Sequence, residues 1–200
     1  MATRTQTSSV TVTDPPFAAR LLGDTRWAWL WLVIRLYVGW TWLTSGMGKL
    51  SNPGWTDSGA ALKGFWEKAA AIPAAPAKPA IVFDWYRSFI QALLDAQAYT
   101  WFSKLAVAGE LLIGVALILG AFTGIAAFFG GLMNWNFMMA GTASVNPVLF
   151  PLSIVLILAW KTAGWWGLDH WIMPQLGSPW RPGVAFQKQQ LQEAEPPNPA

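Results

Sequence analysis

Long apolar runs interrupted by few charges are the main feature of the sequence. Four of these runs are long enough to cross about 30 Å of hydrocarbon, at about 1.5 Å per residue in a helix. They cover residues 27–47, 105–122, 124–141 and 147–168. Four buried helices in a soluble chain of 200 residues would leave almost no surface for water. The pattern therefore predicts an all-α, polytopic membrane protein.

The connections between these runs predict how the helices are arranged. Two short connections, 121–123 and 142–146, require the last three helices to be antiparallel neighbours. About fifty residues separate the first helix from the second, which is too long for a plain loop. We therefore expect an antiparallel four-helix transmembrane bundle with a helical insertion, residues 49–104, between its first and second helices.

The insertion itself carries two helical patterns on either side of a proline-rich hinge, residues 73–79. Asp57 or Ser58 is expected to cap the first helix, and Asp84 the second. Both helices are amphipathic, which predicts that they lie on the membrane surface, over the end of the bundle opposite the termini. The first helix carries Leu62, Phe65, Trp66 and Ala69 on one side, and the second carries Trp85, Phe89 and Leu93 at a spacing of four.

Polar, proline-containing segments flank the apolar region. We expect a mobile tail over residues 1–26, a membrane domain over 27–175 and a proline-rich tail over 176–200. No apolar core of a cleavable signal peptide precedes the first long run. The positive charges near the two membrane faces are nearly balanced, so charge alone does not fix the orientation.

Composition supports the membrane interpretation and excludes several kinds of chemistry. The chain is 54% hydrophobic and 12% charged, and many of its 15 tryptophans lie at the edges of the apolar runs. It has no cysteine, which excludes disulfides, thiolate-ligated clusters and cysteine nucleophiles. A single histidine argues against a haem or metal site on this chain. The net charge of +3, without a basic run, gives nucleic-acid binding little support.

Charged residues inside the apolar runs need an explanation, because each costs at least ~2.5 kcal/mol to insert. Arg35 follows the start of the first helix by eight residues, about 12 Å, and Glu110 precedes Leu119 by nine, about 13 Å. Equal depth and opposite charge predict a buried ion pair between Arg35 and Glu110, with Asn134 nearby. This pair alone would serve only to fix the register of the helices.

The functional interpretation of the same residues is a polar pocket. Arg35, Glu110, Asn134 and Asn136 would line it and bind the head group of a quinone, or relay its protons. A quinone needs hydrogen-bond donors at its carbonyl oxygens and two protons on reduction, and a desolvated glutamate is a suitable donor. No metal ligand set is expected.

Four further residues are weaker candidates for substrate binding: Lys49, Lys161, Asp169 and His170. Lys49 follows a glycine-rich segment and would be available to anions. Lys161 has a simpler explanation, which is that its side chain reaches the interface. His170 would titrate near neutral pH, although an exposed interfacial histidine is often incidental. Small residues along the second and third helices would permit tight packing or a homodimer.

Several motifs occur in order along the chain. They are Arg35-Leu-Tyr-Val-Gly-Trp and Gly46-Met-Gly-Lys-Leu50 in the first helix, Gly109-Glu-Leu-Leu-Ile-Gly114 in the second, Asn134-Trp-Asn-Phe-Met-Met-Ala-Gly141 with Asn146-Pro147 around the third, and Gly164-Trp-Trp-Gly-Leu-Asp169 at the end of the fourth. Together they resemble the motifs of the DoxX/DoxD family of membrane proteins, over roughly residues 20–175. His170 departs from the family, whose members often carry arginine there.

This resemblance implies a role in oxidative sulfur metabolism. DoxD-type proteins form part of thiosulfate:quinone oxidoreductase, in which a second polypeptide accompanies the membrane subunit. The resemblance thus implies a multi-pass protein of the cell membrane with cytoplasmic termini, quinone as electron acceptor and a second redox subunit as partner. The site residues given above come from the physical argument and are not carried over from the family.

Two other functions fit the sequence. The chain would serve as a non-catalytic anchor for soluble thiol or oxidative-stress redox proteins if the insertion were their docking surface. It would serve as a small carrier if the pair of Arg35 and Glu110 were a switch. Thiosulfate-dependent reduction of a quinone analogue by the purified protein separates the enzyme from both alternatives.

Overall fold

The computed structural model of the protein describes residues 14–177, and this part of the chain is helical, without a β-strand. The all-α prediction is therefore confirmed. The helices are α1 (Pro16–Gly23), the 3-10 helix η1 (Thr25–Trp27), α2 (Ala28–Leu50), α3 (Pro53–Thr56), α4 (Ala60–Ala70), α5 (Asp84–Asp95), α6 (Tyr99–Leu119), α7 (Thr123–Met139), α8 (Asn146–Leu158), α9 (Trp160–Ala163) and α10 (Asp169–Gln175).

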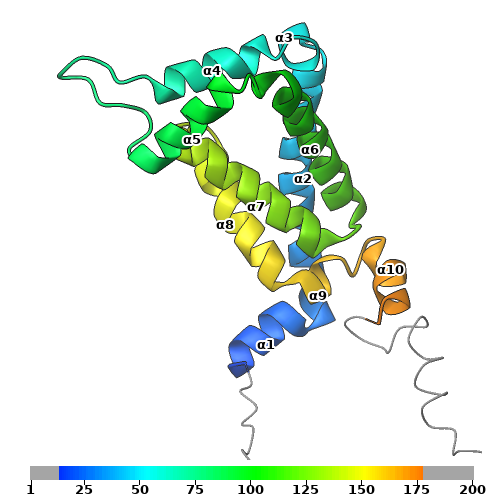
Figure 1. Ribbon diagram of the computed structural model, residues 1–200. Coiled ribbons are helices and arrows are strands. Elements are labelled where there is room, and N and C mark those ends of the chain that lie inside the picture. The colour runs from blue at the N-terminus through cyan, green and yellow to red at the C-terminus, as the bar shows by residue number, and fades with distance from the viewer. Residues whose placement is uncertain (1–13, 178–200) are drawn as a thin grey trace, which may run out of the picture.

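The long helices form two pairs, and these pairs diverge. α2 packs along α6, and α7 packs along α8, whereas α6 and α7 have a much smaller contact (Figure 1). We call the end where residues 120–122 join α6 to α7 the closed end, because the two pairs meet there. The opposite end, where α2 ends and α6 begins, is the open end. The bundle is therefore a wedge.

Glycine allows the close contact between α2 and α6. A Cβ atom on Gly114 would lie 2.6 Å from the backbone nitrogen of Leu43, which no real side chain could tolerate. Gly46 similarly faces Leu111. Small residues at helix contacts let backbones approach closely, which is how membrane helices associate in the absence of a hydrophobic driving force.

The insertion closes over the open end. Its two helices α4 and α5 flank the prolines at 73–79, pack against each other and bridge from the α2–α6 pair to the α7–α8 pair (Figure 1). We call α3, α4 and α5 the roof. The prediction of two short helices over the bundle is confirmed. The roof packs around a hydrophobic core of its own, which consists of Leu62, Trp66, Ala69, Ile81, Tyr86, Ile90, Ala98 and Ala140.

The apolar stripe predicted for α5, Trp85, Phe89 and Leu93, is only partly buried, because Leu93 packs against the core and Phe89 lines a pocket. Trp85 is 59% exposed and Phe89 is 48% exposed, while their neighbours Tyr86 and Ile90 are buried. The periodicity of four was right but could not choose between two adjacent apolar stripes. The predicted caps also moved: Gly59 precedes α4, and the Ser58 hydroxyl accepts a hydrogen bond from its first backbone N–H at 3.2 Å.

The fourth predicted helix is broken. α8 ends at Leu158, α9 is a single turn, and residues 164–168 fold back against the end of α6. In this turn the backbone N–H of Leu168 donates to the carbonyl of Leu119 at 3.0 Å. Gly164 permits the turn, because a side chain there would overlap the carboxylate of Asp169.

The expected N-terminal tail is shorter than predicted. α1 and η1 occupy residues 16–27, and the indole N–H of Trp31 donates to the carbonyl of Leu21 at 3.1 Å. Residues 1–13 of the predicted N-terminal tail and residues 178–200 of the predicted C-terminal tail lie outside the described residues. The described chain begins and ends at the closed end, beyond α1 and α10 (Figure 1).

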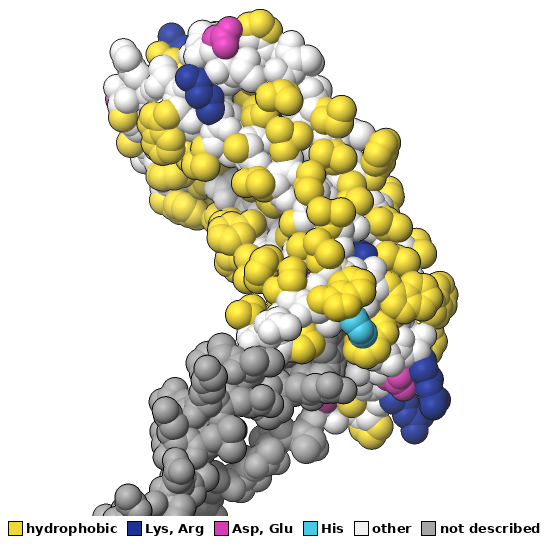
Figure 2. Space-filling view, turned by 90° about the vertical axis from the view of Figure 1, so that its right-hand side faces the viewer, with side chains coloured by type: hydrophobic (Ala, Val, Ile, Leu, Met, Phe, Trp, Pro, Cys, Tyr) yellow, Lys and Arg dark blue, Asp and Glu magenta, His cyan; other side chains and the backbone are white. Residues whose placement is uncertain are grey.

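Membrane character is visible in one helix and on the outer surface. Within residues 14–177, only α6 is both long and apolar enough to span a bilayer, with a mean hydropathy of 2.0. α8 is a shorter apolar helix. Apolar side chains nevertheless cover the outer faces of the long helices, as Figure 2 shows for one side. Examples are Trp40, Leu112, Phe128 and Leu158, which are 52–70% exposed.

Candidate functional site

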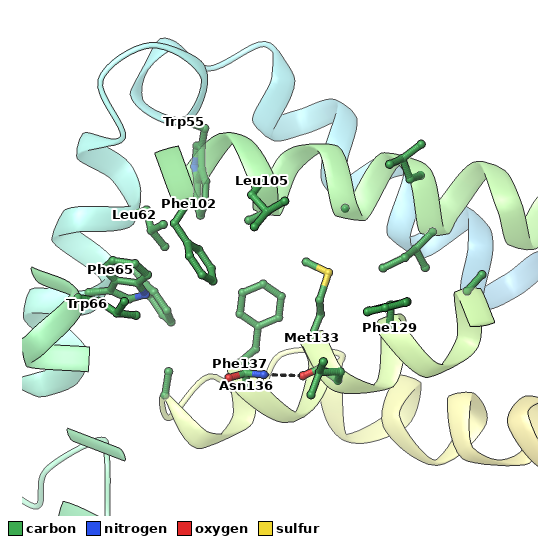
Figure 3. A pocket seen from close by; sticks show the side chains of 18 of the residues that line it. Trp55, Leu62, Phe65, Trp66, Phe102, Leu105, Phe129, Met133, Asn136 and Phe137 are labelled. Carbon is green, nitrogen blue, oxygen red and sulfur yellow. Dashed lines mark hydrogen bonds between the residues drawn. The ribbon is translucent and has the colours of Figure 1, made fainter. Parts of the chain in front are cut away.

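An apolar pocket inside the wedge is the main feature of chemical interest. It has a volume of about 580 Å³ and lies between α6 and α7, under the roof (Figure 3). It exists because α6 and α7 touch at the closed end and separate toward the open end. Its wall includes the aromatic residues Trp55, Phe65, Trp66, Tyr86, Phe89, Phe102, Phe122, Phe129 and Phe137.

The pocket has few polar groups, and two of them meet at its roof. The hydroxyl of Tyr86 donates to the Asn136 backbone carbonyl at 3.1 Å and lies 3.2 Å from its side-chain oxygen. The Asn136 amide nitrogen donates in turn to the carbonyl of Leu132 at 2.8 Å. Burial raises the pKa of Tyr86 above its usual value, which keeps the phenol a hydrogen-bond donor.

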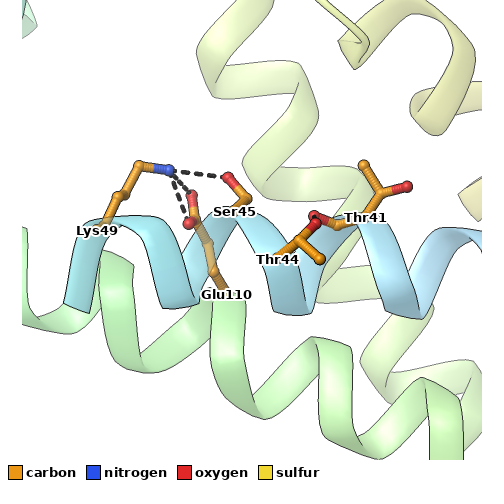
Figure 4. A network of polar contacts seen from close by, with 5 residues as sticks. All are labelled: Thr41, Thr44, Ser45, Lys49 and Glu110. Carbon is orange, nitrogen blue, oxygen red and sulfur yellow. Dashed lines mark hydrogen bonds and ion pairs between the residues drawn. The ribbon is translucent and has the colours of Figure 1, made fainter. Parts of the chain in front are cut away.

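A buried ion pair lies beside the pocket. The ammonium group of Lys49, in the last turn of α2, contacts both carboxylate oxygens of Glu110 at 2.5 and 2.7 Å (Figure 4). Its third hydrogen bond goes to the hydroxyl of Ser45 at 3.1 Å. The side chain of Glu110 is completely buried, and that of Lys49 is 20% exposed. Three donors therefore meet three acceptors, so the charges are compensated.

Two aromatic rings of the pocket wall cover this pair. Lys49 Nζ lies 5.2 Å from the ring centre of Trp55 and 5.7 Å from that of Phe137. Both distances are within the range of cation–π attraction. The pair and the pocket are thus separated by a single layer of side chains.

The predicted ion pair between Arg35 and Glu110 is wrong. α2 and α6 are in register with Gly39 against Leu117 and Gly46 against Leu111, which places Arg35 beside Gly120 at the closed end. The depth estimate assumed that both helices end at the same level. In fact about 10 Å of α2, residues 28–35, extends beyond the end of α6.

Arg35 instead belongs to a buried cluster at the closed end. Its Nη2 donates to the carbonyl of Trp166 at 3.0 Å, and the charge of Asp169 attracts it. Asp169 is 2% exposed and accepts from the backbone N–H groups of Phe122 at 2.6 Å and Thr123 at 2.9 Å. This carboxylate therefore caps the N-terminus of α7, where the helix dipole favours a negative charge.

The predicted pocket residues are thus distributed over four places. Arg35 lies at the closed end, Glu110 pairs with Lys49, and Asn136 lies on the pocket wall. Asn134 is completely buried, and neither polar atom of its side chain has a hydrogen-bond partner within residues 14–177. No hydrogen bond or ion pair joins any two of these four residues within residues 14–177.

The weaker substrate-binding candidates are also separated. Lys49 is at the open end, whereas Asp169, Lys161 and His170 are at the closed end. Lys161 is exposed on α9. The ring of His170 packs edge-on between Trp165 and Trp171, with centroid distances of 4.6 and 5.4 Å. These four residues do not form a common site.

The sequence argument missed the aromatic wall and the partner of Glu110. Ser45 and Lys49 are one turn apart on α2, and this spacing could have indicated that they act together. Trp55, Tyr86 and Phe137 had no such signal, because their contacts depend on how the roof folds over the wedge. Only the three-dimensional arrangement identifies them.

Comparison with known proteins gives one family. The DoxX family model matches residues 30–143, which cover α2 to the end of α7 and include both walls of the pocket. No curated protein and no solved structure matches the chain. Since the match covers more than half of the sequence, this chain belongs to the DoxX family of membrane proteins.

Proposed function

We propose that the protein is the membrane subunit of a redox complex and that it binds a quinone in the apolar pocket. In this proposal α2, α6, α7 and α8–α9 all cross the plasma membrane, with both termini in the cytoplasm. The observation that carries the proposal is the pocket itself, because it is apolar, lined by aromatic rings and placed between two helices of a membrane protein.

The chemistry of the pocket fits a quinone. An isoprenoid tail needs apolar walls, and the outward-facing Leu112 and Phe129 at the pocket wall would let it enter from the lipid. A quinone ring stacks on aromatic side chains, and its carbonyl oxygens need donors. Asn136 and Tyr86 are the polar groups on the wall that would orient the ring.

The resemblance to the DoxD branch supplies the reaction. Two thiosulfate ions would lose two electrons in total and join through a new sulfur–sulfur bond to give tetrathionate. One quinone would take up these two electrons and two protons to give the quinol. The chain has no cysteine, so oxidation would occur at a second redox subunit or directly against the quinone.

The test separates binding from turnover. The purified protein in lipid vesicles should bind a photoreactive quinone analogue saturably, and Gly109→Phe, which fills the pocket, should weaken this binding about tenfold or more. Gly48→Phe is the matched control, because Gly48 is exposed on α2 and has open space around it. Equal binding by both variants would refute the pocket as the quinone site.

Turnover is then measured as thiosulfate-dependent reduction of the quinone, with the protein alone and with membranes of its host. The redox proposal expects reduction in at least one of these preparations, and Gly109→Phe should abolish it. Saturable quinone binding without reduction in either preparation would leave a quinone-binding protein that does not oxidise thiosulfate.

A scaffold role is the second candidate, and the surface of the roof favours it. Val82, Phe83 and Trp85 are 52–76% exposed beside one another before and at the start of α5. Such a patch suits a protein partner as well as lipid head groups. Replacing all three with serine should release a redox partner from the membrane if the protein is a scaffold, and should leave quinone reduction intact if it is not.

A further inference from the structure

Among the described residues that line the pocket, Tyr86 is the only titratable one, and its phenol is held as a donor. None of these residues is a group that would protonate a quinone at neutral pH. α7 and α8 carry no Asp, Glu, Lys, Arg or His. Charged residues of the roof are used elsewhere, with Lys63 and Glu67 paired at 3.6 Å on the surface and Asp84 paired with Arg87 at 2.5 Å. Lys68 and Asp95 are exposed.

The pair of Lys49 and Glu110 is the charged group that lies against the pocket. Gly109, the neighbour of Glu110, lines the pocket, while the carboxylate of Glu110 turns toward α2 (Figure 4). Trp55 and Phe137 contact Lys49 Nζ from the pocket side. A movement of one ring would therefore bring the pair into contact with a ligand in the pocket.

The other side of the pair leads to the surface. Ser45 accepts a hydrogen bond from Lys49 and is itself exposed. Thr44 is exposed and Thr41 is half-buried, so hydroxyl groups continue from Ser45 along α2. We call Thr41, Thr44 and Ser45 the hydroxyl face. The side chain of Lys49 is 20% exposed in the last turn of α2, and charged groups of membrane helices typically face the bundle interior or a water-filled cavity.

We propose that the pair of Lys49 and Glu110 takes up protons from water along the hydroxyl face of α2 and delivers them to the ligand in the pocket. The proposal rests on the proposed function for the identity of that ligand. Each quinone gains two electrons from the sulfur donor and two protons through the pair. The pair is restored by two protons from water, so its charge is unchanged after each turnover.

The absence of cysteine makes a direct test of the water path simple. Ser45→Cys introduces a thiol on the hydroxyl face. Met47→Cys introduces a thiol on another face of α2, about 3 Å further along the helix axis. Met47 is 56% exposed, so steric access is similar. A membrane-impermeant cationic methanethiosulfonate should modify Ser45→Cys at least roughly tenfold faster, because only a thiol in contact with water forms the reactive thiolate. Thr44→Cys serves as a second reporter.

Equal rates for Ser45→Cys and Met47→Cys, or a slower rate for both Ser45→Cys and Thr44→Cys, would overturn the water path. This measurement needs no turnover. It therefore stands even if the pocket binds no quinone, and a failure of the proposed function is recognised separately by the loss of saturable quinone binding.

The same variants test proton delivery. Modified Ser45→Cys carries a bulky cation beside Lys49 and should reduce quinone about 100-fold more slowly than the unmodified variant, with quinone binding within twofold. The slow reaction should also show a larger solvent deuterium effect. Modified Met47→Cys should keep its rate. Full activity of modified Ser45→Cys, or a loss of binding in parallel with activity, would overturn delivery through this pair.

Discussion

The two ends of the wedge use charge in opposite ways. At the closed end, Arg35 and Asp169 are almost completely buried and fix the turn between α6 and α7 to the segment after α9. At the open end, Lys49 and Glu110 join α2 to α6 beside the apolar pocket. The first cluster holds helices together, and the second lies where they separate.

This difference shows that a buried charge in a membrane helix can serve either the stability of the fold or the chemistry of a site. Arg35 donates to the backbone carbonyl of Trp166 and is attracted by the charge of Asp169, whose carboxylate caps α7. Lys49 keeps a partial exposure and touches two rings of the pocket wall. We therefore assign stability to the closed end and chemistry to the open end.

The largest expected effect is at the closed end. Asp169→Asn removes the charge that attracts the buried Arg35 and weakens the hydrogen bonds that the carboxylate accepts from the N–H groups of Phe122 and Thr123. Hydrogen bonds to a charged group are worth about 1.5–3 kcal/mol each, so we expect a loss of about 3 kcal/mol. Thermal unfolding in detergent should show this loss, whereas Asp57→Asn, at an exposed aspartate of the roof, should not. A similar effect of both variants would contradict the assignment of stability to the closed end.

The second largest loss of stability is expected at the open end, where one partner of the pair of Lys49 and Glu110 is removed. Glu110→Leu should cost about 1.5–3 kcal/mol, because Lys49 loses charged hydrogen bonds. Adding Lys49→Met should recover most of that loss. Adding Arg35→Met to Glu110→Leu should instead be additive to within about 0.5 kcal/mol, since the two sites are remote. Urea unfolding of the single and double variants measures both cycles, and coupling in the second cycle would disprove the register described here.

A backbone change at the closed end should have a smaller effect. Gly120 has a φ of +69°, and a side chain there would overlap the Arg35 guanidinium. Gly120→Ala should therefore cost about 1–3 kcal/mol and displace the buried cluster. Gly23→Ala is the control, because no atom lies within 4 Å of the added carbon. Calorimetry of the two variants gives the comparison, which fails if Gly120→Ala unfolds at the wild-type temperature.

The smallest effect is expected in the roof. Tyr86→Phe removes the donor to Asn136 and should cost about 0.5–1.5 kcal/mol. Since burial raises the pKa of Tyr86, its neutral form stabilises the fold below about pH 10, and this contribution is lost as the pH rises further. Tyr86→Phe should thus flatten the decline of stability between neutral and alkaline pH. An unchanged decline would place the titrating group elsewhere.

Patterns within one helix were readable from the sequence, and contacts between helices were not. The spans of α2 and α7, the two roof helices and their hinge follow from local periodicity and proline, whereas α6 was expected over residues 105–122 and extends over Tyr99–Leu119. The register of α2 on α6 depends on Gly39, Gly46 and Gly114, which fit together only in one alignment. A depth count from helix ends could not detect it, so Glu110 was matched to the wrong cation.

The candidate site was predictable only in part. Lys49, Glu110 and Asn136 stood out as polar residues in apolar surroundings, and all three lie at or beside the pocket. The break after α8 was missed because it depends on long-range contacts, in which Gly167 lies against Arg35 and Gly120 and Asp169 caps α7. The roles of Trp55 and Phe137 depend on the same long-range packing.

The separation of α2 from its partners has a consequence for synthesis of the protein. Lys49 meets Glu110 61 residues later, and Arg35 meets the carbonyl of Trp166 131 residues later. At about 5–20 residues per second, a ribosome needs roughly 3–12 s for the first interval and 7–26 s for the second. During that time α2 carries two unpaired cations. We therefore expect the insertion machinery, or a chaperone there, to retain α2 until the partners of these two cations have been synthesised.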